Sequence, residues 1–563
     1  MSFCYNCGSR VEPGDRFCPA CGAAVETISG EREASMATND SNAACGYLFT
    51  NLELLALKLK VTQTRIRKIL KAYIETRSQQ GIFYSIVDVS CYEPKLAVNQ
   101  VAGRVYRLAP EDDWEVYQRL LTDQYTYDTE TAGKNVRYLF IIGGNDIIPM
   151  PELPHYINPG ETIDSDLPYG FLYGKQTLKM LADHTLLAKP QMMHTGRLPV
   201  SPDMDISCFE AYLKRVIQVA DQGIDFSGIY GQVDSSWKVV SSLITEQFRT
   251  SNCFVPSPSD DETYIYDSLV LTPDVTRMNI GQFFHPEASI YYFNMHGSDA
   301  PGMAGFYGIQ NGRNIEGITP AELGSVRKPN VVVTEACYGA RFIQKDAKES
   351  MLVSSINNQT VLFLGASRVA YGCTDDLLKN KHCPLIQADI MAGVFMHTLC
   401  MGYTAGEALM LARKDLLSTL DISNSHLVTL TEFNLFGDPA LSIFPEYEDE
   451  LEEEESAASM SILCAHAERI EVRTVYDCSG SGSLLDRLRQ SVDRNMQEII
   501  DYINQELYTV YGIKPRSLTR AFEIRSASGR KSMLYQFAGN YGNEILVSMN
   551  GKHQIIEILT SKI

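Results

Sequence analysis

The stretch VVVTEACYGARF, residues 331–342, is decisive for the fold because it joins a strand signal to a reactive side chain. Its opening run of β-favouring residues is typical of a buried strand. Cys337 comes just after that run, with Gly339 two positions on. Cysteine is among the most buried residue types, so a buried free thiol is one interpretation. The other is a nucleophile at the carboxyl edge of a parallel sheet, where open α/β proteins build their sites.

Short apolar runs of the same kind recur between residues 82 and 445. They include YSIVDV, VRYLFIIGG, ASIYYFNMHG and TVLFLGAS, and they alternate with helical stretches such as AGEALMLARKDLL. Continuous apolar strands are expected where helices cover both faces of a sheet. The pattern predicts an α/β fold with a mostly parallel sheet flanked by helices.

A nucleophilic cysteine needs a base, and His296 in SIYYFNMHGSDAPG is the best candidate because it also follows an apolar strand. Neighbouring parallel strands bring their carboxyl ends to one edge, so His296 and Cys337 are expected to share a cleft. Gly297 has no Cβ, and its N–H and that of Cys337 can together hold an oxyanion. The remaining candidate histidines lack this glycine-flanked strand end: His184, His194, His382, His397 and His426.

Composition limits the class of protein. With 563 residues, the chain is long enough for roughly three or four domains. It has no run of about 20 apolar residues, so no membrane span is expected. The start MSFCYNCGSR does not read as a signal peptide, which favours the cytoplasm. The formal net charge of −20 disfavours broad binding to a nucleic-acid backbone.

Four of the 14 cysteines lie in the first 21 residues, as two CxxC pairs separated by ten residues. Four thiolates at this spacing suit tetrahedral Zn²⁺, so residues 1–26 are predicted to form a structural zinc ribbon. A site made only of cysteines keeps no open position, which argues against catalytic zinc. The ribbon's mixed charges favour a protein contact over nucleic acid. The predicted zinc ligands are Cys4, Cys7, Cys18 and Cys21.

Composition also divides the rest of the chain. We expect a flexible linker over residues 27–46, a helical segment over 47–81 and the α/β domain over 82–445. The acidic block EYEDELEEEE introduces a second linker, residues 446–458, and residues 459–563 form a further unit. This last unit is predicted to be α+β, with an amphipathic helix and then the strands FEIR, MLYQFAG, EILVSMN and HQIIEIL. It carries no catalytic signature, so we interpret it as an interaction or regulatory domain.

The segments around Cys337 and His296 resemble those of a known family. EACYG is similar to the Ala-Cys-x-Gly nucleophile segment of the caspase-like cysteine peptidases, and NMHGS to their His-Gly segment. Within that group the resemblance is to the gingipain-type family. Five further landmarks occur in the expected order: FIIGGNDIIP (140–149), DSDLPYG (164–170), GRLPV (196–200), LGASRVAYG (364–372) and NLFGDPAL (434–441).

The resemblance implies a caspase-like α/β fold and a peptide-bond hydrolase with a cysteine–histidine dyad. Carried over to this sequence, Cys337 is the nucleophile and His296 is the base and then the acid. The amides of Gly297 and Cys337 form the oxyanion hole, and catalysis needs no cofactor. Glu335 either orients the nucleophile segment or is a solvated carboxylate.

The family also implies Asp166, in its Ser-Asp-x-x-Tyr-Gly segment, as the floor of the primary specificity pocket. A carboxylate there would select Arg or Lys before the scissile bond. Asp164, Asp375 and Asp376 are alternatives for this role.

The leading hypothesis is a cysteine endopeptidase that cleaves proteins or peptides after Arg or Lys and is switched or targeted by its flanking domains. Unlike secreted gingipains, the chain shows no recognisable export signal or pro-segment, which points to a bacterial intracellular enzyme with a regulatory protein partner. The alternative is a catalytically silent scaffold that acts through the ribbon and the carboxy-terminal unit. A nucleic-acid sensor is less favoured by the ribbon's charges.

Overall fold

The computed structural model comprises two compact units, Met1–Asn42 and Ala43–Ile563. In the first unit, β1 (Ser2–Phe3) and β2 (Arg10–Val11) pair antiparallel. The structure describes residues 2–3, 10–11, 43–96, 105–173, 176–182, 191–224, 228–250, 269–375, 385–417, 423–444, 471–477, 500–505, 517–525, 531–538, 544–550 and 555–561.

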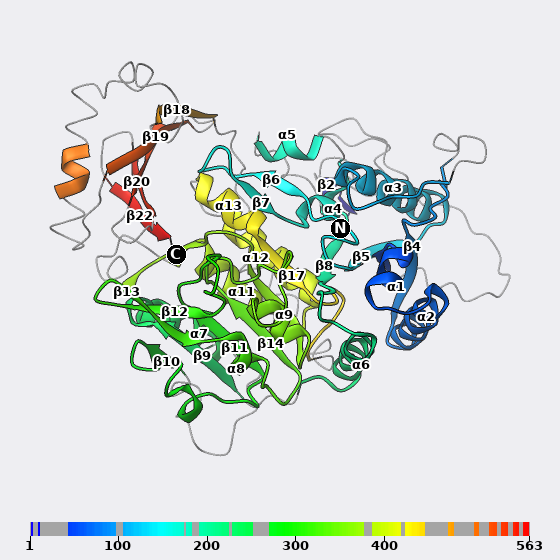
Figure 1. Ribbon diagram of the computed structural model, residues 1–563. Helices are drawn as coiled ribbons and strands as arrows, with labels where there is room; N and C mark the ends of the chain where they lie inside the picture. The colour runs from blue at the N-terminus through cyan, green and yellow to red at the C-terminus, as the bar shows by residue number, and fades with distance from the viewer. Residues whose placement is uncertain are drawn as a thin grey trace. The chain divides into compact units, whose positions relative to one another are not determined.

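A ten-stranded sheet organises the larger unit (Figure 1). In spatial order its strands are β10 (Leu269–Thr272), β9 (Ile229–Asp234), β11 (Ile290–Asn294), β14 (Asn330–Thr334), β15 (Thr360–Ala366), β17 (Phe433–Phe436), β8 (His194–Leu198), β5 (Asn135–Ile142), β3 (Ala44–Thr50) and β4 (Ile82–Asp88). Neighbours pair in parallel everywhere except between β15 and β17. The sheet therefore has two parallel halves that run in opposite directions, and the carboxyl ends of β11 and β14 share one edge.

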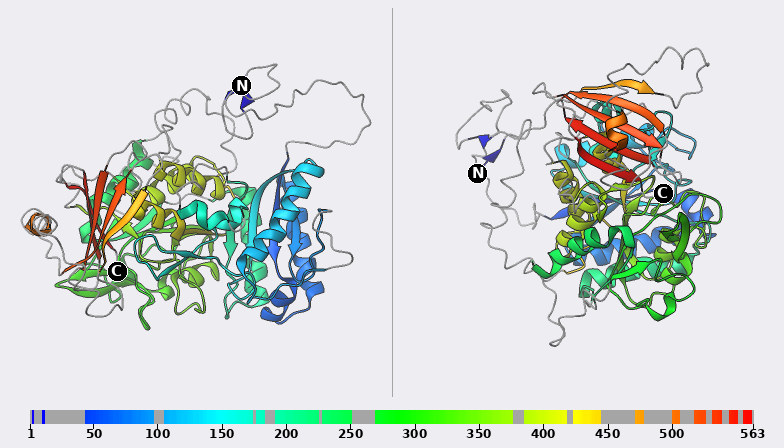
Figure 2. Two further views of the ribbon diagram at one scale, coloured as in Figure 1. Left: turned by 90° about the horizontal axis from the view of Figure 1, so that it is seen from above. Right: turned by 90° about the vertical axis from the view of Figure 1, so that its left-hand side faces the viewer.

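Helices cover both faces of this sheet (Figures 1 and 2). One group consists of α1 (Leu52–Lys58), α2 (Gln63–Gln79), α6 (Ile206–Gln222), α8 (Pro320–Leu323) and α9 (Met351–Ile356). A second group consists of α7 (Lys238–Thr250), α11 (Ala388–Cys400), α12 (Ala405–Leu417) and α13 (Asn424–Glu432). Further α-helices are α3 (Trp114–Thr126), α4 (Leu167–Phe171) and α5 (Gln176–Ala182). The predicted mostly parallel α/β architecture is confirmed.

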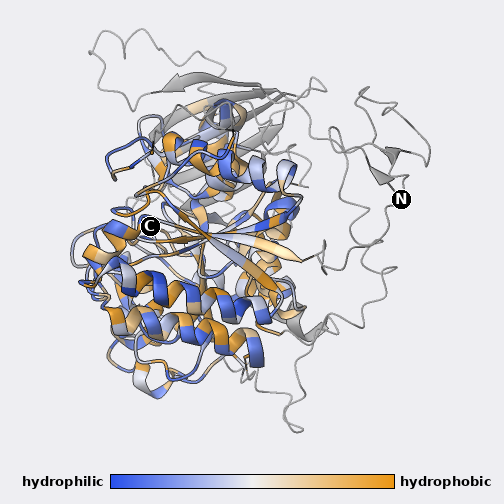
Figure 3. Ribbon diagram, turned by 90° about the vertical axis from the view of Figure 1, so that its right-hand side faces the viewer, coloured by the Kyte–Doolittle hydropathy of each residue, from blue (hydrophilic) through white to orange (hydrophobic). Residues whose placement is uncertain are grey.

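Amphipathic spacing explains why these helices form against the sheet. In α2 the buried residues Ile66, Leu70 and Tyr73 recur three or four positions apart, so one stripe faces the core. Figure 3 shows the same alternation of hydrophobic and hydrophilic residues along the helices. The ends are defined locally as well: Asp205 caps α6 by accepting the N–H of Cys208 at 2.8 Å, and Gly223 ends it with φ +72°.

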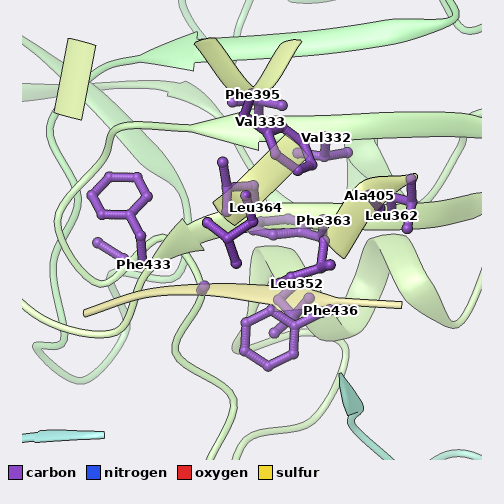
Figure 4. Close-up of a cluster of buried hydrophobic side chains, with 14 of the residues drawn as sticks. Val332, Val333, Leu352, Leu362, Phe363, Leu364, Phe395, Ala405, Phe433 and Phe436 are labelled. Atoms are coloured by element: carbon purple, nitrogen blue, oxygen red, sulfur yellow. The ribbon is translucent and has the colours of Figure 1, made fainter. Parts of the chain in front are cut away.

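Buried apolar side chains surround β14 and β15. By register, Val332 of β14 shares one face of the sheet with Phe436 of β17, and Val333 shares the other face with Leu362 and Leu364 of β15; Figure 4 shows these side chains. All five of these side chains are fully buried. Burying one such side chain contributes roughly 1.5–3 kcal/mol. The strand that leads to Cys337 is therefore held by packing in the core.

Residues 44–50 correct a sequence expectation. They were expected to belong to a linker and to the start of a helical segment, but they form β3, which lies between β5 and β4. The run ACGYLFT is short and apolar, and periodicity does not separate a strand from a helix in such a run. The apolar residues that follow it do lie in helices, α1 and α2. The large sheet therefore begins well before residue 82.

A second sheet near the end of the chain is antiparallel. Its order is β16 (Tyr371–Gly372), β22 (Ile555–Ser561), β21 (Glu544–Asn550), β20 (Lys531–Ala538), β19 (Ser517–Arg525) and β18 (Glu471–Asp477). The four strands predicted for this unit are confirmed as β19 to β22. The predicted amphipathic helix lies mostly outside the described residues, although 500–505 are helical. Two hairpins complete the fold: β6 (Glu152–Pro154) with β7 (Thr162–Asp164), and β12 (Phe306–Gln310) with β13 (Arg313–Ile318).

Among the described residues, no helix combines the length and the apolar character that crossing a membrane requires. Most of the first linker, the whole acidic linker and most of the ribbon lie outside the described residues, so their boundaries stay predictions.

Candidate active site

His296 and Cys337 follow neighbouring parallel strands at the same level. Phe293 of β11 pairs with Thr334 of β14, and each of the two functional residues lies three positions beyond its paired residue. The structure therefore brings the thiol-bearing and imidazole-bearing segments to one edge of the sheet, as the strand-end argument predicts.

The turn that carries Cys337 is sharp. Tyr338 has φ +56°, a left-handed conformation that costs a non-glycine residue free energy and often occurs at functional sites. Two backbone bonds hold the turn: Tyr338 N–H to Arg368 O at 2.7 Å and Gly339 N–H to Ala336 O at 3.0 Å. Gly339 is required here because a Cβ would lie 2.8 Å from a methyl group of Thr334.

The Cys337 thiol is fully buried beneath the segment that follows β15. The N–H of Ala370 donates to the sulfur at 3.3 Å, and the sulfur lies 3.7 Å from the Ala370 oxygen. A backbone donor at the sulfur stabilises a thiolate. The next two residues, Tyr371 and Gly372, form β16, so the loop over the thiol continues directly into the antiparallel sheet.

Gly297 and Cys337 are in intimate backbone contact. A Cβ added to Gly297 would lie 1.9 Å from the Cys337 carbonyl oxygen, which no side chain can tolerate. The two segments proposed to carry the oxyanion donors therefore abut, and glycine is the residue type that permits it.

A small cleft lies between the segment after His296 and the segment that carries Cys337. Its lining includes Ser298, Tyr338, Arg341 and Lys345. Asp299 binds the last two cations, at 3.0 Å each, and so ties the segment after His296 to the segment after Cys337.

The His296 ring is almost completely buried, at 7% exposure. Its backbone forms an isolated bridge with Tyr307 of β12: the His296 N–H donates to the Tyr307 carbonyl oxygen at 2.8 Å, and the His296 carbonyl oxygen accepts the Tyr307 N–H at 2.9 Å. On one face it meets the indole of Trp237, with ring centroids 4.5 Å apart. Of the other histidines, His184 and His382 lie outside the described residues, and burial lowers the pKa of His194 and His426 to about 4.

Asp166 lies in an internal ion pair. Its two oxygens accept from Nε and Nη2 of Arg197 at 2.8 and 2.7 Å, and the guanidinium is fully buried. Arg197 also donates to the carbonyls of Gly143 and Ile148, at 2.9 Å each. Both oxygens of the Asp166 carboxylate are thus occupied by the Arg197 guanidinium. Asp166 is also not among the residues that line the cleft beside Cys337.

The alternative specificity residues are similarly engaged. Asp164 pairs with Arg368 at 3.3 Å, although burial still raises the pKa of this carboxyl. Asp375 caps α7 by accepting the N–H of Val239 at 2.8 Å. Asp376 lies outside the described residues.

Sequence reasoning missed a buried polar network beneath the two strand ends. Glu335 is fully buried, so it is not a solvated carboxylate, and it accepts from the Tyr292 hydroxyl at 2.5 Å. Burial, reinforced by this carboxylate, raises the pKa of Tyr292. Asn294 donates to the Ser241 hydroxyl at 3.1 Å, which links β11 to α7. The sequence analysis also overlooked Asp234 as a candidate site residue, although it is a polar residue at the carboxyl end of a strand, β9.

The four cysteines predicted to bind zinc lie outside the described residues. Among the residues that are described, no group of three or more His, Cys, Asp or Glu side chains is placed to hold a metal.

An α/β sheet that presents a thiol and an imidazole on adjacent strand ends, with glycine between their backbones, has the architecture of a cysteine-dependent hydrolase. The chain belongs to peptidase family C25, whose model matches residues 61–444, and it is a cysteine-type peptidase. The match begins before residue 82, and β3 lies ahead of it in the chain. A zinc-ribbon domain model matches residues 3–25.

Solved structures with similarity to the chain include the Arg-specific cysteine proteinase gingipain R, at 12% identity and TM-score 0.46, covering 93% of this chain and 98% of that one. A complex of Porphyromonas gingivalis RgpB pro- and mature domains gives 12% identity and 0.42, covering 92% and 99%. The separase–securin complex of Saccharomyces cerevisiae gives 12% and 0.29, covering 59% and 17%. The search of curated proteins gave no match.

Proposed function

We propose that the protein is an endopeptidase in which Cys337 is the nucleophile and His296 the general base and then the acid. The observation that carries this proposal is the shared register of the two residues on β11 and β14. The thiolate attacks the scissile carbonyl carbon and forms a C–S bond, and the carbonyl electrons move onto oxygen. The N–H groups of Gly297 and Cys337 receive that oxyanion.

The second half of the reaction uses the same two side chains. The imidazolium donates its proton to the leaving amine as the C–N bond breaks, which leaves an acyl-enzyme. His296 then accepts a proton from water, whose oxygen attacks the thioester carbonyl. The C–S bond breaks and the proton returns to sulfur, so neither a metal nor a redox cofactor takes part in the balance.

For specificity we propose cleavage after Arg or Lys in protein or peptide substrates, supported by the family resemblance. Asp166 does not support it, because Arg197 already neutralises that carboxylate. Mass-spectrometric mapping of cleavage sites in a denatured protein mixture tests the preference directly. Cleavage enriched after Arg and Lys is expected, and cleavage without a basic residue before the scissile bond would contradict it.

We also propose that the carboxy-terminal unit regulates the site. The thiol is covered by Ala370, and the adjacent Tyr371 and Gly372 pair with Ser561 and Thr560 of β22. Substrate cannot reach a fully buried sulfur unless this loop moves. Pairing with β22 holds the loop down, so a protein partner that binds the antiparallel sheet can control access.

Breaking this pairing is expected to open the site. Proline has no N–H and removes a ladder bond, and the N–H groups of a strand alternate between its two neighbours. β22 lies between β16 and β21, so Thr560→Pro and Ser561→Pro should differ in their effects. The variant that removes an N–H facing β16 should release β16, and the other should mainly weaken the pairing with β21. The first should raise the hydrogen-exchange rate of residues 368–373 and the alkylation rate of Cys337 by about tenfold, a loss of roughly 1.4 kcal/mol of loop stability. Alanine at each position is the matched control, and unchanged exchange in both proline variants would contradict the mechanism.

The ribbon is proposed to hold one structural Zn²⁺ through Cys4, Cys7, Cys18 and Cys21. Four thiolates suit tetrahedral zinc, and a module of this size depends on the metal to fold. Cys7→Ser and Cys18→Ser are each expected to remove about one equivalent of zinc in elemental analysis. The thermal transition of the larger unit should be unchanged, because Ala43–Ile563 is a separate compact unit. Full zinc content in both variants would exclude these ligands.

We propose a cytoplasmic location, as the sequence predicts. Fractionation of the source cells tests it.

A further inference from the structure

Trp237 is packed against the imidazole that the proposed mechanism needs. The two ring centroids lie 4.5 Å apart with a 50° angle between the planes, and the indole is 2% exposed. A cation over an aromatic face is stabilised by the ring quadrupole, most strongly by that of Trp. At this separation the indole quadrupole acts in favour of the protonated imidazole, against the burial of the ring, which favours the neutral form.

The turn that holds Trp237 is fixed from both ends. It is a single 3₁₀ turn, Ser235–Trp237, placed between β9 and α7. On the amino-terminal side of Trp237, the Asp234 side chain accepts the N–H of Ser236 at 2.8 Å. After it, Asp375 caps the first turn of α7 through the N–H groups of Val239 and Val240.

Asp234 also joins this turn to the strand that holds the His296 backbone. Its second oxygen accepts the N–H of Ile309 in β12 at 2.7 Å, and the side chain is fully buried. Tyr307, two residues earlier in β12, forms the backbone bridge with His296. One carboxylate thus connects the indole that meets the imidazole face with the strand that fixes the imidazole backbone.

We infer that Trp237 is a positioning residue that holds the His296 ring and stabilises its protonated form, with Asp234 tying the indole to β12. The inference rests on the proposed Cys337–His296 dyad. In such a pair the thiolate exists at neutral pH only while the neighbouring imidazole keeps its proton. Loss of the indole should shift the pair toward neutral thiol and neutral imidazole, and so reduce the thiolate fraction.

The test compares iodoacetamide alkylation of Cys337 at pH 6.5 and at pH 10, followed by mass spectrometry on the full chain. Trp237→Leu should lower the rate at pH 6.5 about 3- to 10-fold, the size of a cation–π contact, and leave the rate at pH 10 unchanged. A merely structural role would alter both rates alike, because access to the sulfur affects all pH values. Trp237→Phe, which keeps an aromatic face, should be intermediate, and it serves if the leucine variant fails to fold.

An unchanged ratio of the two rates in both variants would overturn the inference and leave the peptidase proposal standing. If wild-type Cys337 itself alkylates as an ordinary thiol that titrates near pH 8.5, the dyad fails and the inference falls with it. Asp234→Asn replaces an acceptor oxygen by an amide nitrogen, so it should lower the rate at pH 6.5 in the same direction. No change in that variant would overturn the part assigned to Asp234.

Discussion

Cys337→Ala is expected to lower peptidase activity by about 10³-fold or more and to leave the fold intact. The substitution removes the sulfur that is proposed to form the acyl bond, and the proposed oxyanion donors alone would supply little turnover. The change is small in volume, because alanine keeps the Cβ and removes one atom from the core cluster. Initial rates with fluorogenic Arg, Lys and uncharged peptides, measured beside the thermal transition, check both parts.

Cys91→Ser is the matched control, because Cys91 is a free and exposed thiol away from the cleft. It should keep full activity. Equal turnover by wild type and Cys337→Ala would exclude the proposed nucleophile. Absence of turnover in the wild type, even after β22 is loosened by proline, would favour the catalytically silent scaffold.

The strand-end argument located Cys337 and His296 because both signals are local. A run of β-favouring residues makes a strand wherever it occurs, and parallel pairing then fixes which ends meet. Their equal distance from the Phe293–Thr334 pair is a consequence of register, which no single-sequence pattern states. The sequence also did not predict that the half of the sheet from β17 to β4 runs opposite to the other half. That direction is set by one antiparallel pair, β15 with β17.

Some landmarks of the resemblance are structural. Asp166 in DSDLPYG binds Arg197 in GRLPV, so these two segments match each other across the fold. Asp438 in NLFGDPAL is fully buried and accepts from the Tyr73 hydroxyl of α2. A motif in sequence does not distinguish a carboxylate that awaits a substrate cation from one already paired within the chain. Only the partner's position decides, and the partner here is distant in sequence.

Asp166→Asn is therefore expected to destabilise the protein by about 3–5 kcal/mol, because it leaves the Arg197 cation buried without a counter-charge. The amide cannot accept at both positions, and its NH₂ group faces guanidinium donors. Urea denaturation of the α/β unit, followed by intrinsic fluorescence, measures the loss as a shift in midpoint. Glu210→Gln is the matched control: it makes the same acid-to-amide change in the exposed pair with Arg65, where about 0–1 kcal/mol is expected.

The same variant separates a structural role from substrate selection. Relative kcat/KM values for Arg and uncharged peptides should be unchanged per folded molecule, since the Asp166 carboxylate is already paired with Arg197. A variant of wild-type stability that has lost its preference for Arg would contradict this and restore Asp166 as the pocket floor. Replacing both partners, Asp166→Leu with Arg197→Met, should recover much of the stability lost in Asp166→Asn, because a buried ion pair exchanged for apolar contacts of similar volume is often neutral.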